Sequence, residues 1–168
     1  NLAPALFILP YFLFSATAGQ IAEKYEKARL IRVTTAMEIA IMSLASFGFI
    51  YGIPWLLLFC LFLTGVQSTL FGPVKYAILP QVLAPEELTG GNGLVEMGTS
   101  ISILIGMIAG MSLLMIPEYG PQAAAAAMIA LAITGHLVSR AIPMAPAIEP
   151  DLKINPNIMA ESLHVLRM

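Results

Sequence analysis

Residues 55–79 read WLLLFCLFLTGVQSTLFGPVKYAIL, an apolar run that is long enough to cross a membrane as a helix. A hydrocarbon core about 30 Å thick needs about 20 helical residues, each rising about 1.5 Å. Outward from this run, four more segments reach the same length. The sequence therefore predicts an all-α, polytopic membrane protein with five transmembrane helices, placed at Leu2–Ala22, Val33–Gly52, Trp55–Leu79, Leu94–Ile116 and Ala123–Ile142.

Composition supports a lipid environment. Hydrophobic residues make up 58% of the chain and charged residues 11%, whereas a soluble domain carries about a quarter charged residues. The net charge of -2 gives no sign of a nucleic-acid partner. No catalytic triad, phosphate-binding loop or metal-spaced cluster is present, so we expect no catalytic residue, metal or cofactor in this chain. Cys60, the one cysteine, lies inside an apolar run and is interpreted as a small lipid-facing or packing residue rather than a reactive thiol.

Four of the eight basic residues fall in the loop Glu23–Arg32, which the positive-inside rule places in the cytoplasm. Counting crossings from this loop puts Pro80–Gly93 on the same side and Asn1 outside. Residues 1–142 are thus predicted to form a transmembrane bundle fragment, and residues 143–168 a cytoplasmic central linker.

Two further expectations concern the ends of the chain. The chain begins at Asn1, without a methionine, and enters a long apolar segment at once, so we interpret it as an excerpt that lacks a preceding helix. Within the proline-containing linker, Asn157–Met168 is expected to begin a short amphipathic helix.

Three ionisable residues lie inside the predicted spans, where a central charge costs at least about 2.5 kcal/mol. Glu38, Lys75 and Glu96 each fall roughly 4–9 Å inside the cytoplasmic interface at the helical rise. The functional interpretation is a charged layer that closes a gate or contacts a polar headgroup. The alternative is that Lys75 and Glu38 snorkel to the interface.

Lys75 shares one helical face with Thr64, Gln67, Ser68 and Phe71, which precede it at spacings of three and four residues. A lipid-facing stripe would not carry glutamine at mid-membrane. We expect this face to line a water-accessible cavity, or else to make a polar contact with another helix.

Small residues recur every four positions in the fourth span, at Gly98, Ser102, Gly106 and Gly110. This pattern predicts close approach of another helix backbone. Ser15 and Gly19 form a shorter version in the first span.

Two further features lie near the predicted cytoplasmic ends of the spans. Pro85–Leu88 is predicted to form one helical turn, which the segment Gly90–Gly93 breaks. Arg140 is expected to anchor the last span, and a proton-relay role for His136, four residues earlier, is a weaker hypothesis.

The loop after the first span resembles the signature of the major facilitator superfamily, Gly-x-x-x-Asp-Arg/Lys-x-Gly-Arg/Lys. Gly19, Lys24 and Lys27 match it, Glu23 replaces the aspartate, and Glu26 stands where glycine is usual. By this resemblance the four motif residues Gly19, Glu23, Lys24 and Lys27 would form a cytoplasmic latch.

A closer resemblance, to the lysophospholipid transporter family of that superfamily, comes from Pro10–Gln20, Phe71–Pro80 and Gly91–Gly98. It implies helices two to six of twelve, the amino-terminal bundle in part, followed by the start of the central linker. Lys75, Tyr76 and Glu96 match motif positions, and with Gln67 and Glu38 they are the candidates for a substrate path.

The resemblance implies a secondary carrier that flips lysophospholipids across the bacterial inner membrane by alternating access. Its partners would be membrane lipid, the lysophospholipid and the remaining helices of the parent protein, with the Asn1 end periplasmic and the carboxyl tail cytoplasmic. Two alternatives stay open: the membrane half of a bifunctional acyltransferase and acyl-carrier-protein ligase, and a major facilitator carrier for another small molecule.

Overall fold

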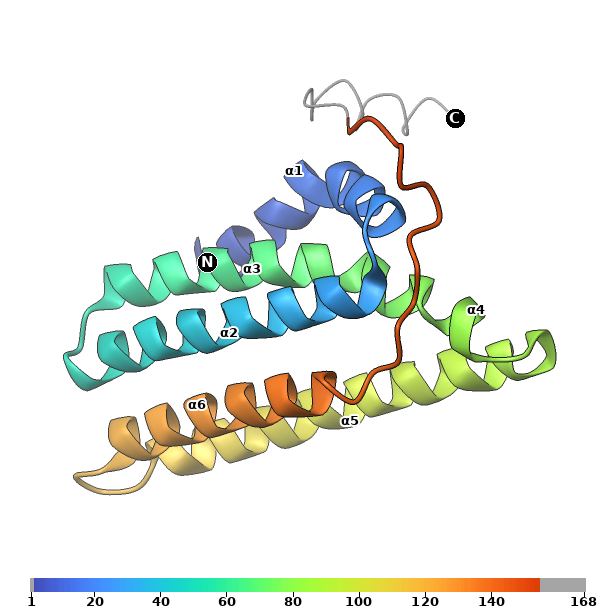
Figure 1. Ribbon diagram of the computed structural model, residues 1–168. Coiled ribbons are helices and arrows are strands. Elements are labelled where there is room, and N and C mark those ends of the chain that lie inside the picture. Colours follow the sequence, from blue (N-terminus) through green and yellow to red (C-terminus); the bar gives the residue numbers. More distant parts are fainter. Residues whose placement is uncertain (1, 155–168) are drawn as a thin grey trace.

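The computed structural model describes residues 2–154, and within that range it contains helices and no strand (Figure 1). Five of the helices are long and apolar enough to cross a membrane. The predicted all-α fold of a polytopic membrane protein is confirmed. The elements are α1 (Leu2–Lys24), α2 (Lys27–Ile50), α3 (Pro54–Ala77), the short α4 (Leu79–Val82), the 3₁₀ turn η1 (Pro85–Glu87), α5 (Leu88–Leu114) and α6 (Gly120–Ser139).

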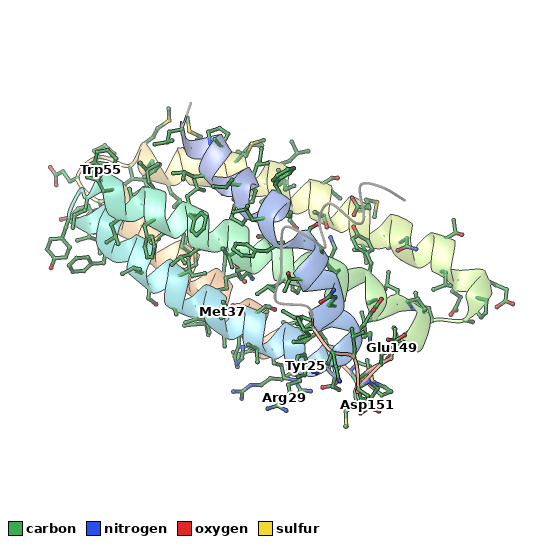
Figure 2. All side chains as sticks on the ribbon, turned by 90° about the horizontal axis from the view of Figure 1, so that it is seen from above. Tyr25, Arg29, Met37, Trp55, Glu149 and Asp151 are labelled. Carbon is green, nitrogen blue, oxygen red and sulfur yellow. The ribbon has the colours of Figure 1, made fainter. Side chains whose placement is uncertain are left out.

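Consecutive long helices run antiparallel to one another. Helix α2 packs between α3 and α6, with α1 against the other side of α3 and α5 against α6 (Figure 1). The α2–α3 and α5–α6 connections lie at one end, and the α1–α2 turn, α4 and the segment after α6 lie at the other (Figure 1). Figure 2 shows the same division, with Trp55 at one end and Tyr25, Arg29, Glu149 and Asp151 gathered at the opposite end.

Two small apolar clusters hold the bundle together. Near the end that carries the α1–α2 turn, Ala22, Ile31, Val74 and Ile78 pack around Ala145, which follows α6. Toward the other end, Cys60 is buried against Ile41 and Ala45, so of the two interpretations it is a packing residue and not a lipid-facing one. The first cluster ties the segment after α6 to three helices.

Among the glycines of the described residues, Gly65 in α3 lies closest to the backbone of another helix. A Cβ atom at this position would lie 2.5 Å from the carbonyl oxygen of Phe7 and 3.0 Å from Cγ of Pro10, both in α1. Only a residue without a side chain allows this contact. The sequence analysis did not single out Gly65, because one glycine in a helix shows no spacing pattern.

The predicted small-residue face of α5 makes no such approach within the described chain. A Cβ atom added at Gly98, Gly106 or Gly110 would meet no heavy atom within 4 Å, and Ser102 is exposed. Helix α5 has no buried residue among those described. Close packing against this face therefore stays a prediction about a partner outside residues 2–154.

The predicted break at Gly90–Gly93 is wrong, because α5 begins at Leu88 and continues through all four residues. The proline-led turn before it is present as η1, and the Glu87 carboxylate accepts a hydrogen bond from the Ala84 N–H at 3.0 Å. Glycine costs a helix about 1 kcal/mol relative to alanine. At Gly91 it serves packing, since a Cβ atom there would collide with the Leu83 side chain. The expected helix at Asn157–Met168 lies outside the described residues.

Replacement of Gly65 tests the α1–α3 contact. We expect Gly65→Ala to lower the thermal stability of the full-length protein in detergent, because overpacking typically costs about 1–3 kcal/mol. Gly72→Ala is the matched control, since a Cβ atom at Gly72 in the same helix meets no neighbour within 4 Å. Equal melting temperatures for the two variants would contradict the close approach.

Candidate functional site

Lys75 and Glu96 meet between α3 and α5. The Lys75 Nζ atom lies 3.9 Å from Oε1 of Glu96 and donates a hydrogen bond to Oγ1 of Thr99 at 3.3 Å. It also lies 4.7 Å from the centroid of the Tyr76 ring. The structure thus brings together three of the predicted substrate-path residues, and it adds Thr99, which the sequence analysis missed. Thr99 follows Glu96 by three residues, a spacing that places both on one helix face.

The two partners of this pair differ in exposure. The Lys75 side chain is 23% exposed, whereas the Glu96 side chain is 60% exposed. Thr99 is oriented by its own helix, since its hydroxyl donates to the Val95 carbonyl at 2.7 Å and its oxygen accepts from Lys75. A partly exposed ion pair contributes little stability, about 0–1 kcal/mol. The arrangement therefore presents an ammonium group positioned by Thr99 and paired with a largely exposed carboxylate.

Gln67 serves a different purpose from Lys75. Its side chain is buried, Nε2 donates to the Thr34 carbonyl of α2 at 3.4 Å, and Oε1 accepts from the Ser68 hydroxyl at 3.3 Å. Of the two interpretations of this polar face, Gln67 fits the polar contact between helices. Glu38 is half-buried in α2 and takes no part in an ion pair among the described residues. Its place in a charged layer stays a prediction.

A second polar contact joins α2 to α6. The Thr35 hydroxyl lies 3.0 Å from Nδ1 of His136 and 3.2 Å from Oγ of Ser139, and both Thr35 and Ser139 are buried. Ser139 also donates to the His136 carbonyl at 2.6 Å. These partners are about a hundred residues apart in the chain, so no local spacing indicates them. The contact gives His136 a packing role, and the proton-relay hypothesis stays untested.

The α1–α2 turn is organised by Glu26. Its carboxylate caps α2, with Oε1 accepting from the Ala28 N–H at 2.9 Å and Oε2 from the Arg29 N–H at 2.7 Å. The backbone of Glu26 is extended, with φ of -62°, so this position has no need of the glycine that the superfamily signature usually carries. Acidic residues are favoured at a helix amino terminus because they accept hydrogen bonds from the free N–H groups and are attracted to the positive end of the helix dipole.

The segment after α6 docks on this turn, and we call residues 145–149 with their partners Glu23, Glu26 and Lys27 the linker clasp. Glu26 Oε1 accepts from the Ala145 N–H at 2.9 Å, and the Lys27 N–H donates to the Ala145 carbonyl at 2.9 Å. Lys27 Nζ donates to the Pro146 carbonyl at 3.2 Å, and this lysine is fully buried. The Glu23 carbonyl accepts from the N–H groups of Ile148 and Glu149, at 3.0 and 3.1 Å.

The four predicted latch residues therefore make different contacts and do not form one site. Lys27 binds the linker through its side chain, and Glu23 binds it through its backbone carbonyl. Lys24 lies 5.9 Å from the centroid of the Tyr25 ring, and Gly19 has open space beside it. Within residues 2–154 the motif region thus contacts the segment after α6, a pairing that the family signature does not indicate.

Hydrogen bonds lower the pKa of Glu26. Burial raises the pKa of this carboxyl group, but the N–H groups of Ala145, Ala28 and Arg29, together with the charge of Arg32, outweigh burial and leave it below the ordinary 4.5. A carboxyl group with a lowered pKa stabilises the folded state fully above its ordinary pKa, and this contribution is lost as pH falls through the folded value. Glu26 therefore holds the clasp at neutral pH.

Comparison with known proteins places the chain in a family. The family model of the Major Facilitator Superfamily matches residues 1–158. This chain belongs to the major facilitator superfamily. The resemblance stated from the loop signature and the three motif stretches is confirmed, since curated relatives at about 30% identity are named as lysophospholipid transporters.

Three relatives illustrate the extent of the match. The lysophospholipid transporter LplT of Serratia proteamaculans is 30% identical over 156 residues, which cover 93% of this chain and 37% of that protein. LplT of Yersinia enterocolitica is 30% identical over 104 residues, covering 62% of this chain and 24% of that protein. LplT of Salmonella typhimurium is 31% identical over 105 residues, covering 62% and 25%. The match thus spans 37% of the Serratia relative and about a quarter of the other two, and no solved structure matches this chain.

Removal of the Glu26 carboxylate tests the linker clasp. We expect Glu26→Ala to speed cleavage at Lys153, an exposed linker residue, by endoproteinase Lys-C in the detergent-solubilised full-length protein. Loss of a helix cap costs about 1 kcal/mol, which raises the open population about fivefold. Glu86→Ala, at an exposed acidic residue of η1, is the control. Unchanged cleavage in Glu26→Ala would show that the clasp does not depend on this carboxylate.

Proposed function

We propose that this chain forms part of a secondary carrier that moves lysophospholipids across the bacterial inner membrane by alternating access. The observation that carries the proposal is the Lys75 site, an ammonium group held inside the bundle by Thr99 and Glu96. The names of the relatives supply the class of substrate. In this proposal the carrier needs membrane lipid around it and the remaining helices of the parent protein.

Lys75 suits the phosphate of a lysophospholipid headgroup. Lysine binds phosphate as a point charge, and a hydrogen bond between two charged groups is about twice as strong as one between neutral groups. An incoming phosphate would replace the exposed Glu96 carboxylate beside Lys75. Because Lys75 is paired before and after this exchange, its charge never lies unpaired within the membrane.

The same exchange links substrate binding to helix movement. The ion pair joins α3 to α5, and a phosphate bound at Lys75 releases α5 from this contact. A ligand shifts a conformational equilibrium only through contacts that differ between the two states. In the proposed cycle, headgroup binding makes that difference at the α3–α5 contact, and the two six-helix halves rock around the bound lipid.

The orientation of the proposed carrier follows from its basic residues. The α1–α2 turn and the segment after α6 lie at the same end of the bundle as Arg29 (Figure 2). By the positive-inside rule this end faces the cytoplasm, so the Asn1 end of α1 is periplasmic and the tail is cytoplasmic. Lys75, two residues before the last residue of α3 at Ala77, then lies near the cytoplasmic face.

Substitution of Lys75 tests the headgroup site. We expect Lys75→Ala to reduce uptake of lysophosphatidylethanolamine by spheroplasts about tenfold or more, since a hydrogen bond to a charged group contributes about 1.5–3 kcal/mol. Lys75→Arg should retain part of the uptake, because it keeps the charge. Lys153→Ala, at an exposed lysine in the linker, is the matched control at equal membrane abundance. Uptake equal to wild type in Lys75→Ala would contradict the site.

Substitution of Glu96 separates substrate competition from simple structural support. If the Glu96 carboxylate competes with the phosphate for Lys75, Glu96→Gln should lower the KM for lysophosphatidylethanolamine, because the amide carries no charge. A rise in KM with unchanged protein abundance would show instead that Glu96 itself contacts the substrate or holds Lys75 in place.

A further inference from the structure

An apolar groove lies along the same side of α3 as Lys75, nearer the opposite end of the helix. Its volume is about 520 Å³, and side chains from α1, α2, α3 and α6 line it, among them Met42, Leu57, Leu61, Thr64 and Met128. Pro54 contributes to the lining, so the groove extends to the end of α3 that carries Trp55 (Figure 2). It is open to the surface of the described chain.

The groove offers nothing to a polar ligand. Thr64 carries the one hydroxyl among the residues that line it, and that hydroxyl donates its hydrogen to the Cys60 carbonyl at 2.9 Å. The remaining lining residues are aliphatic, aromatic or sulfur-containing, and Cys60 is buried. The ligand chemistry that fits such walls is a hydrocarbon chain.

Helix geometry connects the groove to the headgroup site. Leu57 precedes Lys75 by eighteen residues, which is about five turns of 3.6 residues, so both point in the same direction from α3. Thr64, Ser68 and Phe71 lie between them on this face, and each is half-buried. The groove and the ammonium group are therefore two ends of one continuous stripe along α3.

The spacing matches one acyl chain. Thr64, the lining residue of α3 nearest to Lys75, is eleven residues away, or about 17 Å along the helix. Half of a hydrocarbon core of about 30 Å is about 15 Å, the depth that one chain occupies in a leaflet. A chain whose headgroup is held at Lys75 would thus reach the groove only with its far end.

We propose that this groove binds the distal part of the single acyl chain of the lipid whose headgroup lies at Lys75, and so selects for chain length. The inference rests on the proposed function and deepens it, because it assigns the second end of the substrate. Long chains gain apolar contact in the groove, whereas short chains end before Thr64 and gain none.

Uptake of two lipids that share a headgroup tests the proposal in the full-length carrier. We expect Leu61→Trp, which fills the groove, to reduce uptake of stearoyl lysophosphatidylethanolamine about tenfold relative to the octanoyl form. A tenfold factor corresponds to about 1.4 kcal/mol, which is the free energy of burying about two methylene groups of the acyl chain in the groove.

The opposite face of α3 provides a matched control. Leu70 lines a separate apolar cavity of about 210 Å³ between α1 and α3, and it lies nine residues from Leu61, about half a turn away around the helix. Leu70→Trp should change stearoyl and octanoyl uptake by the same factor. An equal loss of both lipids in Leu61→Trp would overturn the inference, because it would show that another helix, not the acyl chain, fills the groove.

A crosslinking measurement keeps the test independent of whether a variant folds. Lysophosphatidylethanolamine with a diazirine near the end of a long acyl chain should crosslink the wild-type carrier at residues 57–64. Crosslinks confined to other segments would overturn the inference while leaving the headgroup site in place. Absence of any lysophosphatidylethanolamine uptake by the wild-type carrier would instead refute the proposed function itself.

Discussion

A polar side chain that is removed from water inside a membrane must find its partner within the protein, and this requirement organises the bundle. Most hydroxyl groups meet it within their own helix, as Thr69 does by donating to the Gly65 carbonyl at 2.7 Å. Gln67 and Lys75 cannot, because their side chains are too long and carry too many donors. They reach across to α2 and α5, just as Thr35 of α2 reaches across to His136 and Ser139 of α6.

Polar groups of the linker clasp also find their partners within the protein, at the surface of the bundle. Glu26 satisfies two free N–H groups at the start of α2 and one in the segment after α6. Lys27, which is fully buried, donates hydrogen bonds to the Ala145 and Pro146 carbonyls. Ala145 completes the apolar cluster beneath them. The signature loop and the segment after α6 are far apart in the sequence. Here they form one packed unit, which joins the α1–α2 turn to the segment after α6.

Local sequence patterns predicted much of this structure, and long-range contacts account for what they missed. Hydropathy and length predicted the five helices, and the helical rise predicted that Lys75 and Glu96 share a layer, because both depend on one segment at a time. Gly65, Thr35 and Ala145 were missed, since each contacts residues far away in the chain. The error at Gly90–Gly93 has the opposite origin: local propensity favours a break there, but packing around Leu83 and the long apolar segment that follows keep the helix intact.

The central claim is that the full-length protein moves a lysophospholipid from one leaflet to the other. Purified protein in liposomes, with radiolabelled lysophosphatidylethanolamine added to the outer leaflet, tests it most directly, because albumin extracts only lipid that has not crossed. The account predicts that extractable label falls at a rate proportional to the amount of protein. A rate equal to that of protein-free liposomes would contradict it.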